Sequence, residues 1–181
     1  MEALSTIQRR FYDDFPPHAS EELYQFATPS TMKPTQVECS KGALNQLPPW
    51  TTISGDIRLT PFYDPIDVMN KVNEYVAELN ANMENIPTRG PCSKYVLPAS
   101  DAANADDDYV KRGILEMKWG EDIAGILQME GIACDLQSPG LQAMIDATQK
   151  VKGEAKPYAI TGSLPLVKQM QKQGFDIQIT G

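Results

Sequence analysis

The sequence predicts an α+β fold in which the elements follow the order α-β-β-α-β, with a shorter β-α segment after them. Three observations predict it. From Thr51 to Thr60 apolar and polar residues alternate, which is typical of a strand with one buried and one exposed face. At Asp64, and again at Ser138, a residue that suits a helix N-cap is followed by proline. Apolar residues then recur at helical spacing after both positions.

The first element is a predicted helix over Glu2–Asp14. Leu4, Ile7 and Phe11 recur there at helical spacing. Two prolines follow Phe15, and because proline cannot continue a helix, the helix is expected to end before them.

Two strands are expected next, over Thr31–Cys39 and Thr51–Thr60. Pro34 lacks the N–H that a ladder hydrogen bond needs, so it indicates a sheet edge or a β-bulge in the first strand. Residues 41–49 form a predicted turn region that leads into the second strand.

A second helix is predicted to begin at Asp64-Pro65, with Asp64 as N-cap and Pro65 at the first helical position. One apolar stripe runs along this helix and forms its predicted core face, namely Met69, Val72, Val76, Leu79 and Met83.

The remaining elements are shorter. Residues Ile114–Trp119 are predicted as a strand, and Ser138-Pro139 opens a further helix. The inward stripe of that helix is expected to consist of Leu141, Met144, Ile145, Thr148 and Val151. Strand, helix and strand are then predicted over Tyr158–Thr161, Leu164–Lys172 and Phe175–Ile179.

Composition narrows the expected class of protein. The chain has 181 residues, 41% of them apolar, which suffices for one ordinary domain or two small ones. Its net charge of -8 argues against nucleic acid and anionic membranes as partners, because both bind clustered Lys and Arg. No apolar run approaches the roughly 20 residues that span a bilayer, and Met1–Arg10 lacks the apolar core of a secretory signal. The three cysteines, Cys39, Cys92 and Cys134, are expected as free thiols in a reducing compartment, either the cytoplasm or an organelle interior.

Asp56 and Arg58 share the polar face of the alternating strand. A guanidinium held on a strand is a good receptor for a carboxylate, because its planar fork can bind both carboxylate oxygens. The alternative interpretation is an ordinary solvated sheet face with no ligand.

Several stretches resemble the M20 family of metallohydrolases, and they follow the family's order along the chain. They are Arg10–Tyr12, Asp14–His18, Phe26–Gln36, Asn45–Pro48, Gly55–Asp64, Arg89–Pro91, Ser93–Pro98 and Lys156–Gly181. The resemblance covers most of the chain and is weak from about Ala99 to Gly131.

The resemblance implies a lid, or dimerisation, domain over residues 1–120 and a partial catalytic-domain segment over residues 121–181. In the family the lid is a ferredoxin-like, four-stranded antiparallel sheet backed by two helices. Its first strand precedes its first helix, so this strand is expected to be missing here and to leave an open sheet edge. The expected partners at this edge and at the lid helices are a second copy of the chain, another protein, or a larger complex.

The resemblance also implies substrate-binding residues. Asn45 and Arg58 match lid residues that bind substrate in the family, often in the neighbouring subunit's site. Gly162 and Ser163 match a substrate loop that opens a helix, where free N–H groups favour a carboxylate. Simpler alternatives remain, with Asn45 as a turn residue and Ser163 as the N-cap of an ordinary turn.

A zinc or cobalt centre is implied for the full-length family. Its histidine and carboxylate ligands are expected before and after this chain, in which His18 is the only histidine. No metal ligand and no catalytic residue is therefore predicted here, and the chain is expected not to hydrolyse anything alone. His18 is expected in a surface loop, and the acidic run Asp106–Asp108 in a solvated insertion.

Taken with the resemblance, the sequence predicts the carboxy-terminal portion of a metal-dependent amide hydrolase without its metal ligands. The alternative is a non-catalytic subunit that docks into a larger complex. A third hypothesis is a small-ligand binder that retains Arg58.

Overall fold

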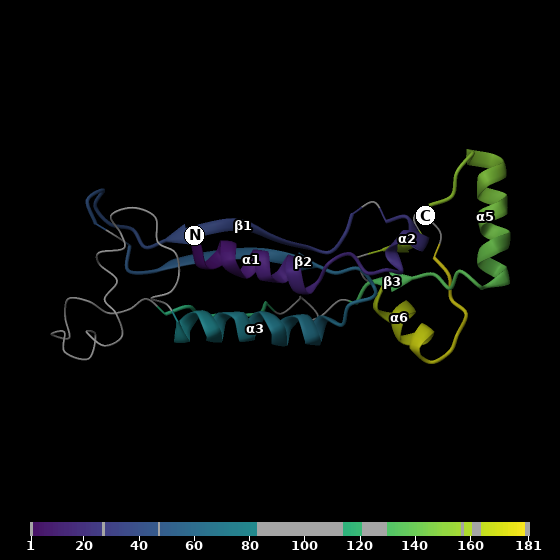
Figure 1. The fold of residues 1–181 in the computed structure, drawn as a ribbon. Helices are drawn as coiled ribbons and strands as arrows, with labels where there is room; N and C mark the ends of the chain where they lie inside the picture. Colours follow the sequence, from purple (N-terminus) through teal and green to yellow (C-terminus); the bar gives the residue numbers. More distant parts are fainter. Residues whose placement is uncertain are drawn as a thin grey trace. The chain divides into compact units, whose positions relative to one another are not determined.

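The computed structural model describes residues 2–26, 28–46, 48–82, 114–120, 130–156, 158–160 and 164–179. The described elements have the predicted α+β composition (Figure 1). They form two compact units, the first made of Met1–Asp14 and Ile66–Leu127 and the second of Phe15–Pro65 and Gln128–Gly181. The predicted domain boundary at residue 120 stays a prediction. None of the described helices is long and apolar enough to cross a membrane.

The first unit contains helix α1, Glu2–Asp14, and most of helix α3, Pro65–Ala81. The predicted core face of α3 is confirmed at three positions and extended at two others, while Met69 is half-buried and Met83 lies outside the described residues. The buried residues of α3 are Val68, Val72, Tyr75, Val76 and Leu79. Arg10 of α1 forms an ion pair with Glu78 of α3 at 2.7 Å.

The strand predicted over Ile114–Trp119 is wrong, because residues 114–120 have no regular secondary structure. Side chains of α3 take the hydrogen bonds that a neighbouring strand would supply. The Asn80 side-chain amide donates to the Leu115 carbonyl at 2.8 Å and accepts from the Leu115 N–H at 2.8 Å. The Trp119 indole N–H donates to Asn73 Oδ1 at 3.1 Å.

The second unit contains an antiparallel hairpin of β1, Thr31–Cys39, and β2, Thr51–Arg58. Thr31 pairs with Arg58 at one end of the hairpin, and Cys39 pairs with Thr51 at the loop end. The register shifts between Pro34 and Gln36, which confirms the β-bulge that the proline indicated.

Two short elements of this unit were not predicted from the sequence. They are helix α2, Glu21–Tyr24, and strand β3, Ile132–Ala133. Strand β3 pairs antiparallel with β4, Ala159–Ile160, which lies within a predicted strand.

Two helices complete the second unit. Helix α5 spans Pro139–Lys152, and its Ser138 N-cap accepts from the Leu141 N–H at 3.1 Å, as the Ser-Pro start predicted. Leu141 is buried, whereas Val151, at the far end of the predicted inward stripe, is exposed. Helix α6 spans Pro165–Lys172 and has Leu164 as its N-cap, in place of the serine that the turn alternative suggested.

The strand predicted over Phe175–Ile179 is also wrong, since this segment has no regular secondary structure. Glutamine side chains bind backbone groups within this segment and beside it. The Gln171 side-chain amide donates to the Ile177 carbonyl at 2.9 Å and to the Ala133 carbonyl at 3.1 Å. Gln178 Oε1 accepts from the Asp135 N–H at 3.0 Å.

Candidate functional site

Arg58 and Asp56 form an ion pair on the polar face of β2. The Arg58 Nε–H donates to Asp56 Oδ2 at 2.7 Å, and the two side chains are 69% and 44% exposed. The alternation along the strand placed them correctly, because residues two apart on a strand point to the same face. Both side chains remain open to a ligand from solution.

The ion pair leaves part of the Arg58 guanidinium free for a ligand. Asp56 binds the Nε–H, and within the described residues no bond to the two terminal Nη atoms is present. Those two nitrogens present parallel N–H groups, which is the arrangement that binds a carboxylate through both oxygens. The site can therefore receive a carboxylate without breaking the Asp56 contact.

A buried polar network holds the chain just after Arg58. Thr60 is fully buried, and its hydroxyl donates to Glu21 Oε1 at 2.7 Å. The Thr60 N–H donates to Ser30 Oγ at 3.0 Å, and the His18 N–H donates to the same Glu21 oxygen at 3.0 Å. A buried carboxylate needs such donors, because water no longer solvates its charge. The network ties the end of β2 to the start of β1.

A cluster of aromatic rings covers the same end of the hairpin. Phe62 contacts His18 and Tyr24, each with ring centroids 5.2 Å apart, and Tyr63 contacts Phe15 at 5.4 Å. The Tyr24 hydroxyl donates to the Cys134 carbonyl at 2.9 Å. Burial raises the pKa of Tyr24. Burial also raises the pKa of Tyr63, and the nearby Glu21 charge makes a smaller contribution in the same direction. These rings therefore stabilise the region as neutral packing groups.

His18 packs within this aromatic cluster and accepts a local hydrogen bond. Its ring stacks on Phe62, and its Nδ1 accepts from the Ser20 N–H at 3.2 Å. Among the described residues, no three His, Cys, Asp or Glu side chains lie together in a group that could hold a metal ion. The residues that the structure describes thus do not fit the implied zinc or cobalt centre. The acidic run Asp106–Asp108 lies outside the described residues.

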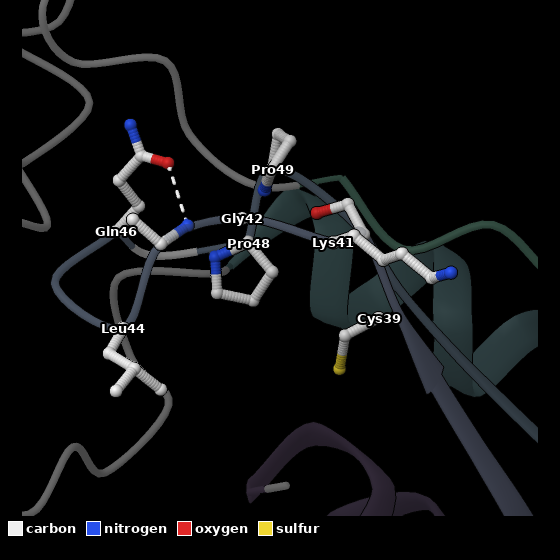
Figure 2. Close-up of a pocket in the computed structure, with 9 residues that line it drawn as sticks. Cys39, Lys41, Gly42, Leu44, Gln46, Pro48 and Pro49 are labelled. Carbon is white, nitrogen blue, oxygen red and sulfur yellow. Dashed lines mark hydrogen bonds between the residues drawn. The ribbon is translucent and has the colours of Figure 1, made fainter.

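Asn45 lies in the loop that joins β1 to β2, and its side chain is exposed. A turn closes the loop beside it, with the Gln46 N–H donating to the Ala43 carbonyl at 2.9 Å and Gln46 Oε1 accepting from the Ala43 N–H at 3.2 Å (Figure 2). The neighbouring Leu44 side chain is exposed and extends away from the loop (Figure 2). The alternative reading of Asn45 as a turn residue therefore fits its surroundings.

The same loop forms an open pocket of about 690 Å³. Its lining includes Cys39, Ser40, Lys41, Pro48 and Pro49, and Figure 2 shows four of them, Cys39, Lys41, Pro48 and Pro49, with labels. The Ser40 hydroxyl oxygen is buried and has no hydrogen-bond partner within the described part of the chain. Asn45 itself does not line this pocket.

The structure does not bring Asn45 and Arg58 together. Asn45 lies in the loop that precedes β2, whereas Arg58 is the last residue of β2. The eight residues of that strand span about 24 Å at roughly 3.4 Å per residue. Gly162 and Ser163, the other two predicted substrate-binding residues, lie outside the described residues.

Sequence reasoning missed the residues that hold this site in place. Glu21, Ser30 and Thr60 come from separate segments, and no spacing in the sequence links them. The adjacent acidic residues Glu21 and Glu22 resemble an ordinary solvated helix start, although only Glu21 is buried.

Comparison with known proteins agrees with the motifs. Residues 1–84 match the model of the M20 peptidase dimerisation domain. The chain is 51% identical over 181 residues to an acetylornithine deacetylase of Arabidopsis thaliana, covering 100% of the chain and 38% of that relative. It is 46% identical over 181 residues to an acetylornithine deacetylase of Dictyostelium discoideum, covering 99% of the chain and 38% of that relative. The chain thus spans 38% of the length of both curated relatives. No solved structure matches the chain.

Proposed function

We propose that the chain is part of a homodimeric amide hydrolase of the acetylornithine deacetylase type, because residues 1–84 match the model of the M20 peptidase dimerisation domain. The reaction would add water across the amide bond of an N-acetylated amino acid, releasing acetate and a free amine. The identity to two acetylornithine deacetylases supports this class of substrate. The structural observation that carries the proposal is the exposed Arg58, whose terminal nitrogens are open to a carboxylate.

Arg58 would bind and orient the substrate through its carboxylate. A bidentate contact fixes the direction of the substrate as well as its position, which a single charge such as lysine does not do. The buried network around Thr60 supports this role, since it holds the strand end that carries Arg58.

Asn45 would serve a different copy of the site. A small N-acetyl amino acid is roughly 10 Å long when extended, whereas Asn45 and Arg58 of one chain are separated by the length of β2, about 24 Å. One substrate molecule therefore cannot contact both residues of the same chain. In a homodimer the exposed hairpin loop would carry the Asn45 amide to the partner's site, where it can donate to a developing oxyanion.

The metal centre is proposed to come from residues other than those described. In an enzyme of this class zinc or cobalt would activate the attacking water and polarise the amide carbonyl. The described residues do not fit such a centre, so the proposed contribution of this chain is to bind and orient the substrate and to form the dimer.

Substitution of Arg58 tests the proposal. We expect Arg58→Lys to weaken binding of N-acetyl-L-ornithine by about 1.5–3 kcal/mol, because a lysine cannot form the bidentate contact. Thr52→Ala, on the same face of the strand, is the matched control and should leave binding unchanged. Calorimetric titration of the purified chain measures both. Equal affinities for wild type and Arg58→Lys would show that Arg58 does not bind the substrate carboxylate through both oxygens.

The alternative hypothesis, a non-catalytic subunit of a larger complex, stays a prediction. No contact or surface within the described residues favours it over the hydrolase.

A further inference from the structure

Lys33 lies on the same sheet face as Asp56 and Arg58. In the hairpin register Lys33 pairs directly with Asp56, and Thr31 pairs with Arg58. Residues that face each other across an antiparallel pair point to the same side of the sheet. The polar face thus carries two cations and one carboxylate next to one another, from two strands.

Gly55 makes this close approach of the strands possible. A Cβ atom at Gly55 would lie 2.3 Å from the Lys33 carbonyl oxygen and 2.9 Å from the Pro34 Cα atom. No larger residue fits there without moving β1 away from β2. The glycine therefore keeps the Lys33 backbone against the strand that carries Asp56 and Arg58, immediately before the β-bulge.

The net charge of these three residues has the opposite sign to the net charge of the whole chain. Lys33 and Arg58 contribute +2 and Asp56 contributes -1, which leaves +1, while the whole chain carries -8. Asp56 holds the Arg58 Nε–H. Among the described residues no ion pair involves Lys33, which is exposed. A local excess of positive charge on an acidic protein attracts a small anion.

We propose that Lys33, Asp56 and Arg58 together form the carboxylate-binding unit of this protein. Arg58 binds the carboxylate through its terminal nitrogens, and Lys33 is the second cation that contacts it. Asp56 is a positioning residue, which holds the Arg58 guanidinium in the orientation that presents those nitrogens. This assignment rests on the proposed function, and it adds two residues that determine specificity for a substrate with a free carboxylate.

Two substitutions of Asp56 separate its positioning role from its charge. Asp56→Asn and Asp56→Ala both remove the negative charge, but only the alanine removes the oxygen that accepts from Arg58 Nε–H. We expect Asp56→Ala to bind N-acetyl-L-ornithine about fivefold more weakly than Asp56→Asn does. The nitrogen-15 NMR signal of the Arg58 Nε–H should remain protected from solvent exchange in Asp56→Asn and lose that protection in Asp56→Ala.

Two substitutions of Lys33 test the second cation. Lys33→Met keeps the length of the side chain and removes its charge, whereas Lys33→Arg keeps the charge. We expect Lys33→Met to weaken binding about two- to fivefold, the upper range of an exposed charge interaction with an anion. Lys33→Arg should retain most of the affinity, and Thr52→Ala should again match wild type.

The ligand pair in this experiment is N-acetyl-L-ornithine and its carboxamide, which lacks the negative charge. Wild type should prefer the acid, and Lys33→Met and Asp56→Ala should reduce that preference. If wild type prefers the acid and both variants retain the full preference, the roles of Lys33 and Asp56 are overturned and the proposed function stands. If wild type binds acid and carboxamide alike, the proposed carboxylate site itself fails, and this inference fails with it.

Discussion

Tyr75 is the residue at which burial and hydrogen bonding combine most clearly. It is buried in α3, donates its hydroxyl to the Asp14 carboxylate, and lies 3.4 Å from the Arg10 carbonyl oxygen. Burial first, and then the Asp14 contact, raises the pKa of Tyr75 well above its ordinary value. The folded protein therefore keeps this phenol neutral at a pH where the unfolded chain ionises it.

This shift predicts a pH dependence of stability. A pKa that is raised on folding contributes stability that is complete below the unfolded value of about 10 and is lost as the pH rises through the folded pKa. Tyr75→Phe should remove this part of the alkaline decline. It should also lower stability at neutral pH by about 1 kcal/mol through the lost hydrogen bond. Urea unfolding of wild type and Tyr75→Phe, measured from neutral to alkaline pH, tests this.

If the free energy of unfolding falls equally at alkaline pH in wild type and in Tyr75→Phe, this prediction is wrong. The decline would then belong to other groups, among them Tyr24 and Tyr63, whose pKa values burial also raises.

At the scale of elements, the hairpin of β1 and β2 depends on one glycine. Gly55 lies where a Cβ atom would meet the Lys33 carbonyl oxygen at 2.3 Å. We expect Gly55→Ala to destabilise the fold by about 1–3 kcal/mol, the usual penalty for overpacking. Gly120→Ala is the control, because no atom of the described residues lies within 4 Å of its added Cβ atom. Urea midpoints followed by circular dichroism measure both, and unchanged midpoints for Gly55→Ala would refute the close approach.

Elements with a strong local signal were predictable from the sequence. Helices α3 and α5 begin at prolines, helix α1 ends shortly before Pro16 and Pro17, and all three carry apolar residues at helical spacing. Strand β2 has period-two alternation, which also placed Asp56 and Arg58 on one face. These signals lie within one segment, so no knowledge of the rest of the fold is needed to detect them.

The two strands that were wrongly predicted show that a local sequence pattern does not reveal which partner a backbone group will bind. Residues 114–119 and 175–179 have strand-like composition, yet amide side chains of Asn80, Gln171 and Gln178 bind backbone groups in or beside these segments. These bonds join residues that are distant in sequence or on different elements. They substitute for a ladder, since the backbone N–H and C=O groups need a partner of any kind.

The site shows the same division between local and long-range information. Arg58 was predictable, but the role of Lys33 depends on the register that the bulge at Pro34 sets. The network of Glu21, Ser30 and Thr60 depends on contacts across as many as 39 residues. Such contacts follow from the folded arrangement and leave no periodic trace in the sequence.

For the whole molecule, the distribution of histidine leads to a prediction about metal and activity. The chain has one histidine, and it packs on Phe62. We expect the purified 181-residue chain to retain no stoichiometric zinc or cobalt after dialysis and to release no acetate from N-acetyl-L-ornithine. Elemental analysis and an acetate assay test this. One tightly bound metal ion per chain, lost in His18→Ala, would contradict it.

For the whole molecule we propose a homodimer in which the two hairpins serve two sites. It rests on the dimerisation-domain match over residues 1–84 and on the separation of Asn45 from Arg58 by the length of β2. A specific dimer would bury roughly 1,200 Å² or more of surface. An exposed strand edge or helix face of the domain would supply it, with apolar residues at the centre.

Sedimentation equilibrium of the purified chain at micromolar concentration measures whether this dimer forms. One chain has a mass of 20.0 kDa, so we expect a single species at twice that mass, 40.0 kDa. Circular dichroism on the same sample establishes that the protein is folded. A folded, monodisperse species at 20.0 kDa across the concentration range would show that the chain is a monomer and would overturn the proposed dimer.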